Sequence, residues 1–174
     1  MGLLLEYTDK NELSKQLTRI RTGEEQVVSL RYSDGDAIKK LEAYIACINE
    51  ELTYKAAANR KAVESGLERP YKDSNIVSLR ARLRRAEKRI YDFQYIWSEA
   101  EQNQKSVLPL YEIDLEHNMI YVFDRMGTIR KRIDVVEKLR VLKIKWSRKN
   151  NRFQGFLTVG KIVGLKKIIK KYEA

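Results

Sequence analysis

Basic and aromatic residues alternate closely between positions 143 and 156, a combination typical of surfaces that bind nucleic acid. Lysine and arginine neutralise phosphates and release condensed counterions, whereas aromatic rings stack on exposed bases. The candidate phosphate ligands here are Lys143, Lys145, Arg148, Lys149 and Arg152, and the aromatic residues among them are Trp146, Phe153 and Phe156. We therefore expect this segment to contact a phosphate backbone.

A pattern of period two places these residues on a β-hairpin with strands over 140–147 and 152–159. A two-stranded ribbon is thin enough to enter a major groove. Alternation predicts that the two lysines of the first strand share one face and that Trp146 and Phe153 point inward. A second interpretation stays open, in which the hairpin is merely solvated and its aromatic residues only face the core.

A basic amphipathic helix is predicted at residues 161–172, because apolar residues recur there every three or four positions. Its lysines are Lys161, Lys166, Lys167, Lys170 and Lys171. The helix could dock on the sheet and present these lysines to phosphate. Alternatively, it could be an ordinary surface helix whose last lysines are stabilised by the helix dipole. Binding to an anionic membrane is less favoured, because a globular chain has its own core to cover with the apolar stripe.

Positive charge is concentrated at one end of the chain. The formal net charge of the 174 residues is +11. Residues 125–174 contain 16 Lys or Arg against three acidic residues, which gives +13, so the first 124 residues sum to −2. Because partners respond to local fields, this distribution indicates that the C-terminal third binds a polyanion.

Acidic residues next to the basic segment raise the question of a metal-dependent nuclease. The cluster consists of Glu112, Asp114, Glu116 and Asp124. Such nucleases place one Asp on a strand and an acid-x-Lys pair on its neighbour, so that two carboxylates hold Mg²⁺. Asp114 could be the first acid, but Lys143 stands where the second carboxylate is needed. We therefore expect a protein that is not an enzyme, and Mg²⁺-dependent cleavage lost on Asp114→Ala would contradict this.

Other signs of a catalytic, metal or cofactor site are weak in this sequence. His117 is the sole histidine, falls in a predicted turn, where we expect it to be exposed, and has no metal-binding companion. Cys47 is the sole cysteine and is best explained as a small side chain beside a helix seam. Neither a P-loop nor a dinucleotide-binding glycine pattern occurs. We expect no cofactor, no bound metal and no small-molecule substrate.

Two long helices precede the basic region. The first carries apolar residues at spacings of three and four, namely Ile38, Leu41, Ile45, Ile48 and Leu52. Gly66 and Pro70 interrupt the pattern, and a second helix starts near Ser74. Helices of this length joined by a short turn favour an antiparallel, coiled-coil-like hairpin over residues 36–104, with Leu52 beside Ala86. Such a hairpin is a natural surface for a protein partner or a second copy of the chain.

The second long helix also carries a basic run, which consists of Arg80, Arg82, Arg84, Arg85, Lys88 and Arg89. In the antiparallel register, Lys88 and Arg89 fall near Glu51 and Glu50 of the first helix. Salt bridges along the edge of the hairpin therefore explain part of the run better than contacts with phosphate.

These patterns predict an α+β protein. Residues 1–35 should form an N-terminal helix and strand, residues 36–104 the helical hairpin, and residues 105–174 a small basic β-rich domain closed by the terminal helix. Within the last domain, a hairpin of strands over 107–115 and 119–124 precedes a third strand over 128–134. A short helical turn is expected at residues 135–139.

A single cysteine excludes an internal disulfide, and the sequence contains no run of about 20 apolar residues that would span a membrane. We expect a cytoplasmic location. The leading hypothesis is a nucleic-acid-binding protein, for DNA or RNA, whose helical hairpin contacts a protein partner or itself. One alternative is a structural protein of an assembly such as a virion or nucleoid, and another is a regulator that binds an acidic protein.

Overall fold

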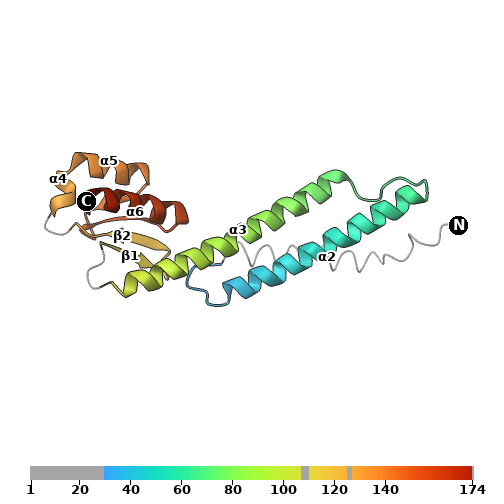
Figure 1. The fold of residues 1–174 in the computed structure, drawn as a ribbon, viewed down its shortest axis with the longest axis horizontal. Coiled ribbons are helices and arrows are strands. Elements are labelled where there is room, and N and C mark those ends of the chain that lie inside the picture. Colours follow the sequence, from blue (N-terminus) through green and yellow to red (C-terminus); the bar gives the residue numbers. More distant parts are fainter. Residues whose placement is uncertain (1–29, 107–109, 125–126, 174) are drawn as a thin grey trace. The chain divides into compact units, whose positions relative to one another are not determined.

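The computed structural model describes residues 30–106, 110–124 and 127–173 (Figure 1). Two long helices are followed by a four-stranded antiparallel sheet with further helices, which confirms the α+β class. The elements in chain order are α2 Ala37–Glu64, α3 Asp73–Gln104, β1 Tyr111–Asp114, β2 Met119–Val122, α4 Thr128–Lys131, α5 Ile133–Val141, β3 Lys145–Ser147, β4 Arg152–Phe156 and α6 Val159–Glu173.

The chain divides into two compact units whose boundary lies inside α3, between Tyr91 and Asp92. The first unit contains α2 and the first part of α3, and the second contains the end of α3, the sheet and α4 to α6. Residues 31–35 also belong to the second unit. The division therefore differs from the predicted boundary after residue 104, because the last turns of α3 contribute to the core of the sheet unit.

Gly66 ends α2, as the sequence predicts. Its φ of 68° lies in the left-handed region, which glycine adopts without steric cost. The N–H of Gly66 donates to the carbonyl of Val63 at 3.0 Å, and the N–H of Leu67 donates to that of Ala62 at 2.8 Å. These two bonds form a Schellman motif that satisfies the last helical carbonyls and turns the chain toward α3.

The buried stripe of α2 is partly polar. Leu41 and Ile48 of the predicted seam are fully buried, but the stripe continues through Glu51, Lys55 and Asn59. Glu51 and Lys55 form an ion pair at 2.8 Å, so neither buried charge lacks a partner. Glu51 therefore has its ion-pair partner within α2 itself. The predicted register of Leu52 beside Ala86 stays a prediction.

The loop between the two long helices is fastened to α2 by Asn59. Its Nδ2 donates to the Tyr71 carbonyl at 2.9 Å, and its Oδ1 accepts the Tyr71 N–H at 3.0 Å. Burial and the hydrogen bond with Tyr54 raise the pKa of Tyr71 to about 12. Because the buried Asn59 amide makes both hydrogen bonds to Tyr71, it fixes the position of the loop relative to α2.

One sheet with the strand order β1-β2-β4-β3 organises the second unit. Two local hairpins, β1–β2 and β3–β4, are joined by antiparallel pairing of β2 with β4. In this register Ile113 pairs with Ile120, Ile120 pairs with Gly155, and Trp146 pairs with Phe153. Because side chains alternate along a strand, all of these residues lie on one face of the sheet.

That face forms the core of the unit. Its buried residues pack with Ile96 and Ala100 of α3, Leu139 of α5, and Ile162 and Leu165 of α6. Figure 1 shows α5 and α6 beside the sheet. The opposite face carries none of the residues of this core cluster within the described part of the chain.

Residues 31–35 are attached to the same unit by specific bonds. Trp97 Nε1 donates to the Tyr32 carbonyl at 2.7 Å, and the Tyr32 N–H donates to Asn118 Oδ1 at 3.0 Å. The Tyr32 ring lies 4.9 Å from that of Phe93. Residues 31–35, which precede α2 in the sequence, are therefore held to the second unit.

One predicted strand is wrong, and another is shorter than predicted. The residues from Thr128 to Asp134, predicted as a strand, form α4 and the start of α5. Their two apolar residues are four apart, a helical spacing, and Asp124 accepts the N–H of Ile129 at 2.7 Å and holds a helical turn. The strand predicted from Arg140 begins only at Lys145. The expected helical turn at 135–139 is part of α5, and the terminal helix is confirmed as α6.

The predictions for the N-terminal region fall largely outside the described residues. This applies to the helix over 9–20 and to most of the strand over 26–32; residues 30–32 lie in a turn and its approach. The start of the strand over 107–115 lies outside them as well.

Gly155 should be required for the fold of the second hairpin. A Cβ at this position would lie 2.9 Å from the Lys143 carbonyl oxygen and 3.3 Å from Ile144 Cγ1. We expect Gly155→Ala to lower the free energy of unfolding by about 1–3 kcal/mol, because the backbone at Lys143 must move. Urea denaturation followed by tryptophan fluorescence measures this change.

Gly160 provides the matched control, because nothing lies within 4 Å of a Cβ built there. Gly160→Ala should raise the free energy of unfolding by about 0.5–1 kcal/mol through its higher helix propensity. Equal effects of the two substitutions would contradict the close approach at Gly155.

Candidate nucleic-acid interface

The tip of the β3–β4 hairpin presents three of the predicted phosphate ligands to solvent. Lys145 lies on β3, and Arg148 and Lys149 occupy the turn; all three are exposed. The turn is shaped by Asn150, whose N–H donates to Ser147 Oγ at 3.3 Å and whose Nδ2 donates to Gln154 Oε1 at 2.8 Å. None of the three cations forms an ion pair with a residue that the structure describes.

Lys143 does not lie on the strand face that the sequence predicts. It is an exposed residue of the turn after α5, with a left-handed φ of 55°, and its N–H donates to the Arg140 carbonyl at 2.9 Å. The predicted shared face of Lys143 and Lys145 is therefore wrong. The Lys143 carbonyl oxygen and the Lys161 Nζ instead approach one point of β4, 2.9 and 3.3 Å from the position of a Cβ at Gly155, and the charge of Lys143 lowers the pKa of Lys161.

Lys161 connects α6 to the hairpin. Its Nζ donates to the carbonyl of Phe156, the last residue of β4, at 2.8 Å. Burial lowers the pKa of Lys161, and the positive charge of Lys143 lowers it further. An anion bound near Lys161 would offset both effects and stabilise its charged form.

Arg152 lies on the outward side of the sheet rather than at the hairpin tip. Its guanidinium carbon lies 3.5 Å from the centre of the Tyr121 ring, and its Nη1 lies 3.7 Å from Glu112 Oε2. Its buried Nε has no hydrogen-bond partner among the described residues. Arg152 is thus held flat against the sheet by a cation–π contact and a weak ion pair.

The five lysines of α6 serve different purposes. The Nζ of Lys166 donates to both carboxylate oxygens of Glu99 at 2.8 and 3.0 Å, and Glu99 on α3 is nearly buried. This hydrogen bond raises the pKa of Lys166. Lys166 therefore ties α6 to α3. Lys167, Lys170 and Lys171 are exposed and make no ion pair within the described residues.

The acidic cluster is divided among separate contacts. Burial raises the pKa of Asp114, but hydrogen bonds from the N–H and the ring of His117 lower it by more, so the net pKa falls below the usual range. Asp124 accepts the Ile129 N–H and the Arg130 Nε at 2.7 Å. Within residues 30–106, 110–124 and 127–173, no three Asp, Glu, His or Cys side chains gather as a metal site would require.

The aromatic residues of the second hairpin fall on opposite faces. Trp146 and Phe153 point inward as predicted, with ring centres 5.0 Å apart, and Arg130 covers Trp146 at 4.4 Å. Phe156 points outward and is 74% exposed. The odd spacing between positions 153 and 156 already carried this signal, because residues three apart on a strand lie on opposite faces.

We call the outward side of the sheet the outer face. The Cα register and the alternation of side chains assign to it Glu112, Asp114, Met119, Tyr121, Lys145, Arg152, Gln154 and Phe156. It combines an exposed ring, two cations and polar amide and carboxylate groups. The Tyr121 hydroxyl donates to Asp114 Oδ2 at 3.5 Å, a long bond that links one ring of this face to one of its acids.

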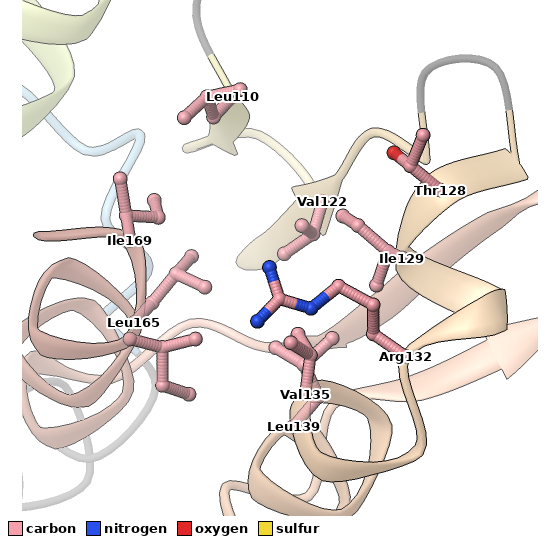
Figure 2. A pocket seen from close by; sticks show the side chains of 10 residues that line it. Leu110, Val122, Thr128, Ile129, Arg132, Val135, Leu139, Leu165 and Ile169 are labelled. Atoms are coloured by element: carbon pink, nitrogen blue, oxygen red, sulfur yellow. The ribbon is translucent and has the colours of Figure 1, made fainter. Parts of the chain in front are cut away.

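A pocket of about 280 Å³ lies on the other side of the sheet unit. Figure 2 shows the Arg132 guanidinium extended among apolar side chains of β2, α5 and α6. Its lining residues are Leu110, Val122, Thr128, Ile129, Arg132, Val135, Leu139, Leu165, Ile168 and Ile169. The lining therefore offers one cation and one hydroxyl but no acid–base pair. Arg132 also lies 3.8 Å from Asp134.

Two residues singled out by type have ordinary surroundings. His117 is exposed in the β1–β2 turn as predicted, and Cys47 is a half-buried free cysteine on α2. No helix within the described ranges is long and apolar enough to cross a membrane. No family model matches the chain, and neither a curated protein nor a solved structure matches it.

Lys166 should matter for stability more than its neighbour. Lys166→Gln removes the partner of the nearly buried Glu99 carboxylate, so we expect the free energy of unfolding to fall by about 1–2 kcal/mol. Lys167→Gln, on an exposed lysine, should change it by less than about 0.5 kcal/mol. Urea denaturation at neutral pH distinguishes the two, and equal effects would contradict the tie to α3.

The same ion pair has a defined pH dependence. Because folding raises the pKa of Lys166, its contribution is fully present below the ordinary lysine pKa of 10.5. The contribution is lost as the pH rises through the raised pKa of the folded protein.

The proximity of Lys143 and Lys161 can be measured directly. Lys143→Gln should raise the pKa of Lys161, because a repelling charge is removed, and burial should still keep it below 10.5. An NMR titration of the Lys161 side chain gives this value. Lys167→Gln is the control that should leave it unchanged. A pKa unaffected by Lys143→Gln would show that the two lysines do not interact.

Proposed function

We propose that this chain is a non-enzymatic, cytoplasmic nucleic-acid-binding protein that contacts the phosphate backbone through the β3–β4 hairpin and α6. The observation that carries the proposal is a group of exposed cations in the turn before β3, on β3 and in the turn of the hairpin. Lys143, Lys145, Arg148 and Lys149 fall within seven residues and have no ion-pair partner among the described residues. Clustered like charges repel one another, so a polyanion that neutralises them gains both attraction and relief of repulsion.

Lys161 extends this group onto α6. Its ammonium lies at the end of β4 beside Lys143, and its pKa is lowered by burial and by that neighbour. A phosphate bound near Lys161 would favour its charged state, against the lowering of its pKa by burial and by Lys143. Lys166 contributes less to binding than the other lysines of α6, because Glu99 already neutralises it. Lys167, Lys170 and Lys171 provide further exposed charge.

The helical hairpin is proposed to contact a protein partner or a second copy of the chain. Three apolar side chains are exposed where α2 ends and α3 begins, namely Val63, Leu67 and Val77. Exposed apolar residues gathered at one end of an element support an interaction surface. An assembly protein would use the same surface for polymerisation, which would appear as association that increases with protein concentration.

The test compares two variants with the same change in charge. The hairpin variant replaces Lys143, Lys145, Arg148 and Lys149 with Gln, and the control variant replaces the exposed Lys39, Arg60, Lys61 and Lys72 with Gln. Affinity for labelled DNA and RNA, single and double stranded, is measured across salt concentrations. We expect the hairpin variant to lose about three units of the slope of log affinity against log salt, and the control variant to keep it.

Two other outcomes would overturn the proposal. Equal losses in both variants would show that only net charge matters. Absence of binding by the intact chain at low salt, combined with binding of poly-glutamate, would favour an acidic protein as the partner instead.

A further inference from the structure

We infer that the outer face selects single-stranded nucleic acid by stacking an unpaired base on Phe156. This inference rests on the proposed function and names its substrate class. It starts from the position of one ring. Phe156 is the last residue of β4, lies 74% exposed on the outer face, and has Met119 as its Cα partner on β2. An aromatic ring left open to solvent on a strand of a basic hairpin is a surface on which a base can stack.

Cations lie on both sides of β4 near this residue. The Nζ of Lys161 donates to the backbone carbonyl of Phe156 at 2.8 Å, on the side of the strand that Gly155 faces, and the Lys143 backbone approaches the same point. Lys145 is on the same outer face as Phe156 and pairs with Gln154, two residues earlier on β4. A nucleotide stacked on the ring would therefore have positive charge available for its phosphates on the hairpin and on α6.

A second flat surface lies farther along the same strand. Arg152, Gln154 and Phe156 share the outer face, so Arg152 lies roughly 13 Å from Phe156 along an extended strand. One side of its guanidinium covers Tyr121, and such a plane can stack on a base with its other side. The two surfaces are too far apart to hold one base, so they suit separate nucleotides of one extended strand.

The exposure of a ring on a sheet favours a single strand over a duplex. In a duplex each base is covered by its neighbours above and below, so its face is not open to a side chain that lies flat on a sheet. An unpaired strand can turn its bases outward and stack them. The hairpin tip alone could contact either form through phosphates, whereas Phe156 adds affinity only for the form whose bases are accessible.

The experiment separates the bases from the phosphates. Fluorescence anisotropy compares three probes of the same length: a twelve-nucleotide oligo-dT, a twelve-unit abasic strand with the same phosphates, and a twelve-base-pair duplex. We expect the intact chain to bind oligo-dT about 5- to 150-fold more tightly than the abasic strand, the range that stacking of one base supplies. The duplex should bind more weakly than oligo-dT.

Two variants test whether Phe156 causes this preference. Phe156→Leu keeps an apolar side chain without a ring and should remove most of the preference for oligo-dT, while binding of the abasic strand stays unchanged. Phe156→Trp keeps a ring and should retain the preference. Because the side chain is largely exposed, both variants should fold, which circular dichroism confirms.

The outcomes distinguish this inference from the proposed function. Equal binding of oligo-dT and the abasic strand by the intact chain would overturn the inference and leave phosphate binding intact. The same holds for tighter binding of the duplex, or for a preference that survives Phe156→Leu. Failure of all three probes to bind at low salt would overturn the proposed function itself.

Discussion

The pairing of β2 with β4 is the constraint on which the rest of the second unit depends. Each hairpin of the sheet is local, but this pairing alone joins them and sets their common register. A slip by one residue would turn Phe153 outward and Phe156 inward, because side chains alternate between faces. The burial of Ile120 and Phe153 against α3, α5 and α6 therefore also decides which ring and which cations face solvent.

The same pairing places an acidic hairpin beside a basic one. All the charged residues of β1 and its turn before His117 are acidic, and those of β3 and β4 are basic. Contact between Glu112 and Arg152 joins the two across the sheet, with Tyr121 between them. The β1–β2 hairpin therefore restrains Arg152, whereas the cations at the far tip lie beyond its reach. Arg152 is thus held by contacts within the sheet, whereas Arg148 and Lys149 in the turn face solvent.

Local signals in the sequence predicted the elements that local chemistry determines. Gly66 ends α2, and the period of α6 matches its buried stripe. The strand predicted at residues 128–134 is wrong because the carboxylate of Asp124 holds a helical turn there. Residue type predicted the candidate phosphate-binding cations, but it did not predict which of them are already paired within the fold. Lys166 is bonded to Glu99, 67 positions earlier, and no spacing rule connects residues so far apart.

Gly155 shows how a site can depend on a residue that contributes no functional group. The hydrogen atom in place of a side chain lets the Lys143 carbonyl and the Lys161 ammonium converge on one point of β4. A larger residue there would push away the Lys143 backbone and the Lys161 ammonium, which its Cβ would meet at 2.9 and 3.3 Å. A search for related binding surfaces that counts only lysines and arginines would therefore miss the determinant of their spacing. In a redesign of this surface, the smallest residue would be the one to leave unchanged.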